Sequence, residues 1–210
     1  MQFKDRHEAG RLLAEKLAKY KNKKNVVILA IPRGGVEIGF EVANALRLKL
    51  DIIVTKKIGL PNNEEFAIGS IGPNKKITLD EETVKIYNVS KDYIKDISKE
   101  IEKEIERRYK AYKGSYKLSR LNDRTVIIVD DGIATGLTAK SAVEYAKSQK
   151  AKKIIVAVPV APIEFVNNFK NNVDEFICLY PAESFFSVSQ FYGVFEQLGD
   201  ADVKRYLKAR

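Results

Sequence analysis

Short apolar runs alternate along the chain with segments of helical periodicity. Runs of strand length fall at residues 26–31, 51–55, 126–129, 153–159 and 174–180. Most lack the polar alternation of a half-exposed strand, which is typical of parallel strands buried on both faces. Amphipathic helical patterns occupy residues 5–20 and 36–48, and further helices open near 137 and 162. The alternation predicts an α/β fold with a doubly wound, mainly parallel sheet flanked by helices.

The longest interval between two of these strands, residues 56–125, carries additional elements. Residues 59–65 are rich in turn formers and predict a loop, and residues 67–79 predict a short hairpin. Ser90 is placed to cap a long helix whose apolar positions recur at steps of three and four. We therefore expect a helical insertion at residues 80–117, which packs either on the sheet or on a second subunit, within a single domain spanning 1–210.

The carboxyl end, residues 181–210, is less regular. Five aromatic residues fall between positions 185 and 195. We expect this hood segment to cover the sheet edge or a partner subunit. The alternative is that Phe185 and Phe186 stack on a planar substrate, the acceptor of a reaction.

Composition describes a soluble globular protein, with 45% hydrophobic and 31% charged residues. No apolar run is long enough to span a bilayer, and the amino terminus has no apolar signal core. The single cysteine, Cys178, excludes disulfides within the chain, so a cytoplasmic location is expected. The single histidine, His7, excludes chemistry that needs several imidazoles.

The formal net charge of +9 has two explanations, a nucleic acid or a small polyanion as partner. The basic residues are spread along the sequence, and most of them alternate with acids. This spacing disfavours nucleic acid.

The clearest chemical signal is residues 126–138. A buried strand stops at Asp130 and Asp131, and a turn with Gly132, Thr135 and Gly136 leads into a helix. Such a turn presents backbone N–H groups and a helix amino terminus to an anion, at the edge where parallel sheets bind ligands. The carboxylates can accept hydrogen bonds from sugar hydroxyls or face a hydrated Mg²⁺. The stretch thus predicts a site for a phosphorylated sugar; the alternative is a solvated turn after a core strand.

A second anion-friendly turn follows the strand at 26–31. It contains Arg33, whose forked guanidinium suits phosphate oxygens, and the flexible pair Gly34 and Gly35. Lys56 and Lys57 follow the strand at 51–55. All these residues are expected at one sheet edge, where they could bind the two ends of one ligand. The alternatives are an ordinary turn with a surface arginine and a solvated lysine pair.

Residues 126–138 resemble the phosphoribosyl pyrophosphate (PRPP) signature of the type I phosphoribosyltransferases, with every position filled. The resemblance implies that Asp130 and Asp131 bind the ribose hydroxyls and serve catalysis. It also implies a 5′-phosphate site and a pyrophosphate site assisted by Mg²⁺. The 5′-phosphate residues would be Gly132, Ile133, Ala134, Thr135, Gly136, Leu137 and Thr138, and the pyrophosphate residues Arg33, Gly34, Gly35, Lys56 and Lys57.

The resemblance covers nearly the whole chain, including the motif at residues 5–11 (Asp-Arg-x-x-Ala-Gly-Arg). The chain is similar to a subgroup of bacterial and archaeal proteins of this family whose substrate is unassigned. It lacks the acceptor-binding patterns of the members that use nucleobases. The resemblance implies an enzyme that transfers 5-phosphoribosyl from PRPP to a nitrogenous acceptor and releases pyrophosphate. It also implies a homodimer.

Two other functions remain open. The same pocket could sense PRPP or a nucleotide and regulate a partner without turnover, or Asp130 could be the nucleophile of a phosphatase-like enzyme. Lysines clustered on one face away from the pocket would favour the sensing module, whereas scattered lysines would favour the transferase.

Overall fold

A five-stranded parallel sheet forms the centre of the molecule. The computed structural model describes residues 2–209, apart from the side chain of Glu65. The strand order is β2-β1-β6-β7-β8, and every neighbouring pair is parallel. In this order the chain reverses its direction of progress between β1 and β6, which is where doubly wound sheets bind ligands. The strands are β1 (Val26–Ala30), β2 (Lys49–Ile52), β6 (Thr125–Val129), β7 (Lys153–Pro162) and β8 (Glu175–Ala182).

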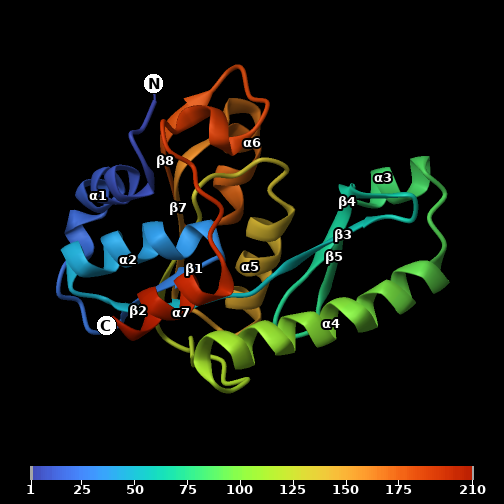
Figure 1. The fold of residues 1–210 in the computed structure, drawn as a ribbon, viewed down its shortest axis with the longest axis horizontal. Helices are drawn as coiled ribbons and strands as arrows, with labels where there is room; N and C mark the ends of the chain where they lie inside the picture. The colour runs from blue at the N-terminus through green and yellow to red at the C-terminus, as the bar shows by residue number, and fades with distance from the viewer. Residues whose placement is uncertain (1, 210) are drawn as a thin grey trace.

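Helices cover both faces of the sheet (Figure 1), which confirms the predicted fold class. Successive strand side chains point to opposite faces, so Ile28 and Val129 join one core cluster while Val27 and Ile128 join the other. The first face carries α1 (Arg6–Lys16), α2 (Gly34–Leu46) and α7 (Asp200–Lys208), and the second carries α5 (Leu137–Ser148) and α6 (Ile163–Phe169). Short 3-10 turns lie at Ala18–Tyr20, Lys170–Asn172 and Val188–Phe191.

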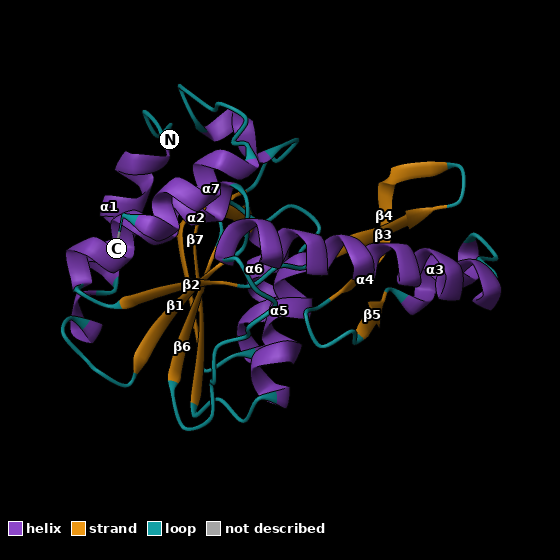
Figure 2. Ribbon diagram, turned by 60° about the horizontal axis from the view of Figure 1, so that its bottom comes forward, coloured by secondary structure: helices purple, strands orange, loops and turns teal. Residues whose placement is uncertain are grey.

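The segment between β2 and β6 projects from one side of the sheet as an arm, residues 56–113 (Figure 2). It holds the antiparallel strands β3 (Lys56–Leu60), β4 (Asn63–Ile71) and β5 (Ile77–Leu79), then α3 (Glu81–Ile86) and α4 (Lys91–Lys113). The predicted loop at 59–65 is wrong, because these residues form the end of β3, a tight turn and the start of β4. Gly59 allows β3 and β4 to approach each other closely there, since a Cβ on this residue would lie 2.5 Å from Glu64 Cα.

The long helix α4 packs within this chain. Its amino terminus is capped as predicted, with the Ser90 hydroxyl accepting from the Tyr93 N–H at 3.1 Å. Its apolar face is buried, and the Tyr109 hydroxyl accepts a 3.1 Å hydrogen bond from the Val54 N–H beside the sheet. Of the two packing alternatives, contact with the sheet is therefore realised. Helix α7, which the sequence pattern did not predict, packs against α4 and α2.

Among residues 2–209, no helix combines the length and the apolar character needed to cross a membrane.

Candidate functional site

The two glycine turns meet at the carboxyl edge of the sheet. Gly34 and Gly35 open α2 after β1, and Asp130 and Asp131 follow β6, the strand paired with β1. A Cβ on Gly34 would lie 2.5 Å from Asp131 Cγ, and one on Gly35 would lie 2.8 Å from Asp130 Cα. Only glycine permits this approach. The fold therefore joins two of the predicted site elements that are almost a hundred residues apart in the sequence.

Asp130 and Asp131 form a carboxyl pair with raised pKa values. The Asp131 N–H donates to Asp130 Oδ1 at 2.9 Å. Burial raises the pKa of Asp130, and the neighbouring Asp131 charge raises it further. Burial also raises the pKa of Asp131, although the Arg6 guanidinium opposes the rise. Hydroxyl donors from a ligand would stabilise both ionised carboxylates.

Arg6 is a site residue that the sequence reasoning missed. From α1, its Nε donates to Asp131 Oδ2 at 2.8 Å, and its Nη1 donates to the Glu196 carbonyl at 2.9 Å. The guanidinium also lies 3.8 Å from the centre of the Phe195 ring, and the residue is 5% exposed. The only sequence signal was its position in the motif at residues 5–11. Arg6 thus fixes Asp131 and ties the hood segment to the site.

The turn from Gly132 to Thr138 is anchored at two points. The buried Ile133 donates its N–H to the Val160 carbonyl of β7 at 2.9 Å. Gly136 has φ +76°, and a Cβ there would lie 2.5 Å from Cζ of Phe165. Gly136 caps α5 without a side-chain hydrogen bond, so the first N–H groups of the helix have no intrahelical acceptor. The turn can therefore bind an anion with its backbone.

Individual residues of this turn differ in what they can offer. Ala134 and Thr135 are exposed and Thr138 is half-buried, so the two hydroxyls can face a ligand. The Leu137 side chain is buried, and its carbonyl accepts from the Ser70 hydroxyl at 2.8 Å. Leu137 can contribute to an anion site only through its N–H.

The predicted pyrophosphate cations divide into two places. Lys56 and Lys57 line a cavity of about 530 Å³ between β3 and α4, together with Thr138 of the turn at 132–138. Burial lowers the pKa of Lys56, and the nearby Arg108 lowers it further. Arg33 is exposed at the start of α2, after a cis peptide bond with Pro32, and it does not line this cavity. The structure thus brings Lys56 and Lys57 to the turn at 132–138, and Gly34 and Gly35 to the carboxyl pair.

The hood segment touches the site through Val188. A Cβ on Gly132 would lie 2.6 Å from Val188 Cγ1, and the Tyr192 hydroxyl donates to the Asp131 carbonyl at 2.6 Å. Phe185 packs its ring 5.4 Å from that of Phe191, whereas Phe186 is 89% exposed. Of the two aromatic candidates, only Phe186 presents a free ring.

The site suits a cation that arrives with its ligand. Among residues 2–209, no group of three carboxylate, histidine or cysteine side chains could hold a metal ion. The carboxyl pair offers two groups, and Asp131 is already engaged by Arg6. Mg²⁺ keeps much of its coordination as water and phosphate oxygen. The residues therefore fit Mg²⁺ only if phosphates of a ligand supply most of its oxygens.

The chain is similar to proteins of a known family. The family model described as "Phosphoribosyl transferase domain" matches residues 2–177. The Mycobacterium tuberculosis protein named "Putative phosphoribosyl transferase Rv0571c" is 38% identical over 205 residues, which cover 98% of this chain and 46% of that protein. The chain therefore spans about half the length of the curated relatives it matches.

Solved structures extend the comparison. The crystal structure of TT1426 from Thermus thermophilus is 33% identical, with a TM-score of 0.81, and covers 99% of this chain and 98% of its own. The AQ2163 protein from Aquifex aeolicus is 15% identical, with a TM-score of 0.52 and coverage of 82% of this chain and 73% of its own. The latter likeness concerns the fold alone.

Proposed function

Because this chain belongs to the phosphoribosyl transferase domain family, we propose that it transfers the 5-phosphoribosyl group of PRPP to a nitrogenous acceptor. Pyrophosphate is the second product. The observation that carries the proposal is the contact of Gly34 and Gly35 with Asp130 and Asp131, which joins an anion-binding helix start to a carboxyl pair. PRPP needs both features, since its ribose ring carries hydroxyls and a pyrophosphate on the same face.

The ribose 5-phosphate end of PRPP would bind at the turn 132–138. The N–H groups at the start of α5 and the hydroxyls of Thr135 and Thr138 would hold the 5′-phosphate. Asp130 and Asp131 would accept hydrogen bonds from the ribose 2′- and 3′-hydroxyls. Each such bond favours the ionised carboxylate and offsets the burial that raises its pKa.

The pyrophosphate would lie between the start of α2 and the lysine pair. The N–H groups of Gly34 and Gly35 have no intrahelical acceptor, and Arg33, Lys56 and Lys57 add positive charge. When bound with PRPP, Mg²⁺ would neutralise charge on the pyrophosphate oxygens. Together these groups would stabilise the leaving group.

In the reaction, the bond between ribose C1 and the pyrophosphate oxygen breaks, and its electron pair leaves with pyrophosphate. The acceptor nitrogen attacks C1 from the opposite face and loses a proton as the C1–N bond forms. The ionised Asp130 and Asp131 would stabilise positive charge that develops on the ribose, so their contribution is positioning and electrostatics. Phe186, free at the hood segment, is our candidate for stacking on the acceptor.

One observation favours a second function, a PRPP-sensing module that regulates a partner without turnover. Most of the excess positive charge of the chain gathers in one cavity away from the carboxyl pair, lined by β2, the end of α4, residues 114–124 and α7. By contrast, the match of residues 2–177 to the phosphoribosyl transferase domain family disfavours a phosphatase-like enzyme.

Calorimetric titration tests the binding half of the proposal. PRPP should bind more tightly with Mg²⁺ than without it, and more tightly than ribose 5-phosphate. The double variant Asp130→Asn with Asp131→Asn should weaken PRPP binding by about tenfold or more, since each lost charge-assisted hydrogen bond is worth roughly 1.5–3 kcal/mol. Unchanged affinity in the double variant would refute the ribose assignment.

Arg33→Ala tests the pyrophosphate end. It should weaken PRPP far more than ribose 5-phosphate, which has no pyrophosphate, while Arg11→Ala, an exposed arginine on α1, should change neither. Equal losses for the two ligands would place Arg33 elsewhere. An assay of pyrophosphate release from PRPP in the presence of nitrogenous bases then separates the two functions. PRPP binding without pyrophosphate release, whichever base is added, would support the sensing module.

A further inference from the structure

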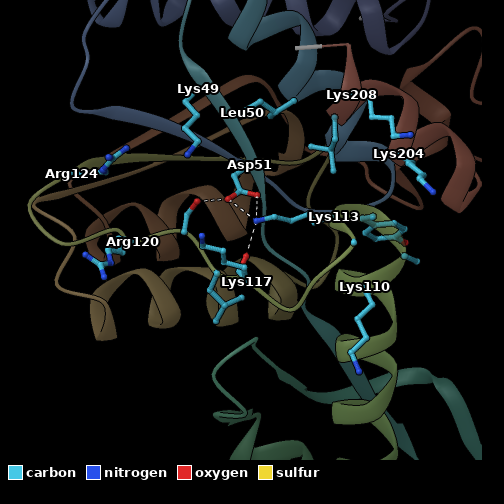
Figure 3. Close-up of a pocket in the computed structure, with 16 residues that line it drawn as sticks. Lys49, Leu50, Asp51, Lys110, Lys113, Lys117, Arg120, Arg124, Lys204 and Lys208 are labelled. Atoms are coloured by element: carbon cyan, nitrogen blue, oxygen red, sulfur yellow. Dashed lines mark hydrogen bonds and ion pairs between the residues drawn. The ribbon is translucent and has the colours of Figure 1, made fainter.

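A cavity of about 890 Å³ lies along the outer edge of the sheet, at β2 (Figure 3). Its walls come from β2, the carboxyl end of α4, the following segment 114–124, and α7. Basic side chains dominate the lining, which contains one acid, Asp51. The basic residues are Lys49, Lys110, Lys113, Lys117, Arg120, Arg124, Lys204 and Lys208.

These residues hold most of the excess charge of the protein. Eight cations and one carboxylate give the lining a formal charge of +7, whereas the whole chain carries +9. The remaining charges of the chain are thus almost balanced. The basic residues that are scattered along the sequence converge in space, on a face away from the carboxyl pair.

The single carboxylate of the cavity is already neutralised. Lys113 Nζ donates to both Asp51 oxygens, at 2.8 and 3.0 Å, and the Ser119 hydroxyl and Ile52 N–H also donate to this side chain. Asp51 is 5% exposed, so it anchors the segment 114–124 to β2. It offers little to the other cations.

The other seven cations have no hydrogen bond or ion pair from their side chains to any residue in the described range 2–209. The carboxyl end of a helix stabilises nearby cations, which explains the positions of Lys110 and Lys208 in the last turns of α4 and α7. It does not account for Lys49, Lys117 or the two arginines, because these lie outside helices. Unpaired like charges repel one another, and an anion would relieve the repulsion.

We propose that this cavity binds a small ligand that carries several phosphates, such as an inorganic polyphosphate or a nucleoside polyphosphate. Lysine and arginine are the usual partners of phosphate oxygens. The cavity volume lies within the range of small-ligand sites. The volume and the concentrated charge therefore favour a compact polyanion.

This polyphosphate site is separate from the proposed PRPP site. Lys49 begins β2, whereas Lys56 and Lys57 lie beyond its carboxyl end, and the two cavities share no lining residue. The helix α4 contributes to both cavities, with residues 93–108 lining the PRPP side and residues 110–113 lining the polyphosphate side. The inference consequently stands whether or not the chain is a transferase.

Titration with inorganic tripolyphosphate and with ATP at moderate salt tests the site. The triple variant Lys117→Gln, Arg120→Gln and Arg124→Gln should lose at least about tenfold in affinity for tripolyphosphate. A matched control, with Lys21, Lys91 and Lys95 each changed to Gln, removes the same charge from exposed positions outside the cavity. It should retain affinity within twofold. Comparison of the two ligands shows whether a nucleoside adds affinity to the phosphates.

Each contrary outcome overturns the inference. An equal loss of tripolyphosphate affinity in the control variant would mean that binding depends on the net charge of the protein alone. A loss in Arg33→Ala together with full binding in the triple variant would place the polyphosphate in the PRPP pocket. A 20-base-pair DNA duplex that binds more tightly than tripolyphosphate, and loses that affinity in the triple variant, would replace the small ligand with nucleic acid.

Lysine acetylation of the unaltered chain gives a second measurement that does not depend on any variant folding. Tripolyphosphate should protect Lys49, Lys117 and Lys204, which are exposed in the structure, and leave Lys21 reactive. Equal reactivity with and without tripolyphosphate would refute the site.

Discussion

Replacing Arg6 by glutamine tests how the site is held together. Arg6 donates to Asp131 at 2.8 Å and to the Glu196 carbonyl at 2.9 Å, and it is 5% exposed. Glutamine keeps much of the side-chain length but removes the charge and the fork. Asp131, whose side chain is only 15% exposed, would remain in place without this cation.

The expected loss follows from these contacts. Removing one partner of a buried ion pair costs about 3–5 kcal/mol, because the other charge stays unpaired. For a domain of this size, about 2–4 °C of melting temperature corresponds to 1 kcal/mol, so the midpoint should fall by about 6–20 °C. PRPP affinity should also fall by about tenfold, since the Asp131 oxygens lose the group that orients them.

Thermal denaturation at several pH values is the decisive assay. Arg6 opposes the rise in the Asp131 pKa, so the variant has a still higher folded-state pKa. The folded variant then binds its proton more tightly than the unfolded chain, whose carboxyl has a pKa of about 3.9. Its stability should therefore fall more steeply than that of the wild type as pH rises above about 4. The difference between the two proteins should be smallest in acid and largest near neutral pH.

Arg11→Gln is the matched control, because Arg11 is an exposed arginine on the same helix. It should leave stability and PRPP affinity almost unchanged. A loss in Arg6→Gln that does not vary with pH would refute the ion-pair reasoning. In that case lost packing of the guanidinium on the Phe195 ring would be the cause.

Two further substitutions probe the turn at 132–138 and the carboxyl pair. Asp130→Asn should raise the melting temperature near pH 7 by a few degrees and flatten the fall of stability with rising pH. The reason is that burial and Asp131 raise the Asp130 pKa, which makes the ionised carboxylate costly in the folded protein. Asp92→Asn, which changes an exposed carboxylate, should not raise the melting temperature. Gly136→Ala should destabilise by more than Gly114→Ala, since both glycines have positive φ, +76° and +74°, but only a Cβ on Gly136 meets the Phe165 ring. Equal losses in the two alanine variants, measured by denaturant unfolding, would contradict the clash.

Local patterns were sufficient for the strands of the central sheet, for most of the helices and for the two turns, but not for α7 or the loop at 59–65. The β-branched apolar runs before Asp130 and Pro32 are buried strands, and Ser90 caps a helix as expected. These features depend on residues close in sequence, and periodicity and capping chemistry report them directly. The turn formers at 59–65 were misleading because only Pro61 and Asn62 form the turn, whereas the residues on either side pair as strands β3 and β4.

The partners of each site residue depend on long-range contacts. Arg6 lies 125 positions from Asp131, and its carbonyl partner Glu196 lies 190 positions away. An arginine on an amphipathic helix has the same local pattern whether it faces solvent or a buried carboxylate. Its role depends on the packing of α1 against α2 and β7, which brings Arg6 to Asp131 after β6.

The fold class and the chemistry of the two turns could be predicted from the sequence, because strand burial, glycine positions and helix starts are local properties. The place where the positive charge gathers depends instead on how the chain folds. Basic residues from β2, α4, the segment 114–124 and α7 alternate with acids along the chain, yet they line one cavity (Figure 3). Electrostatic potential depends on distance in space, and folding brings these cations together while their sequence neighbours point elsewhere.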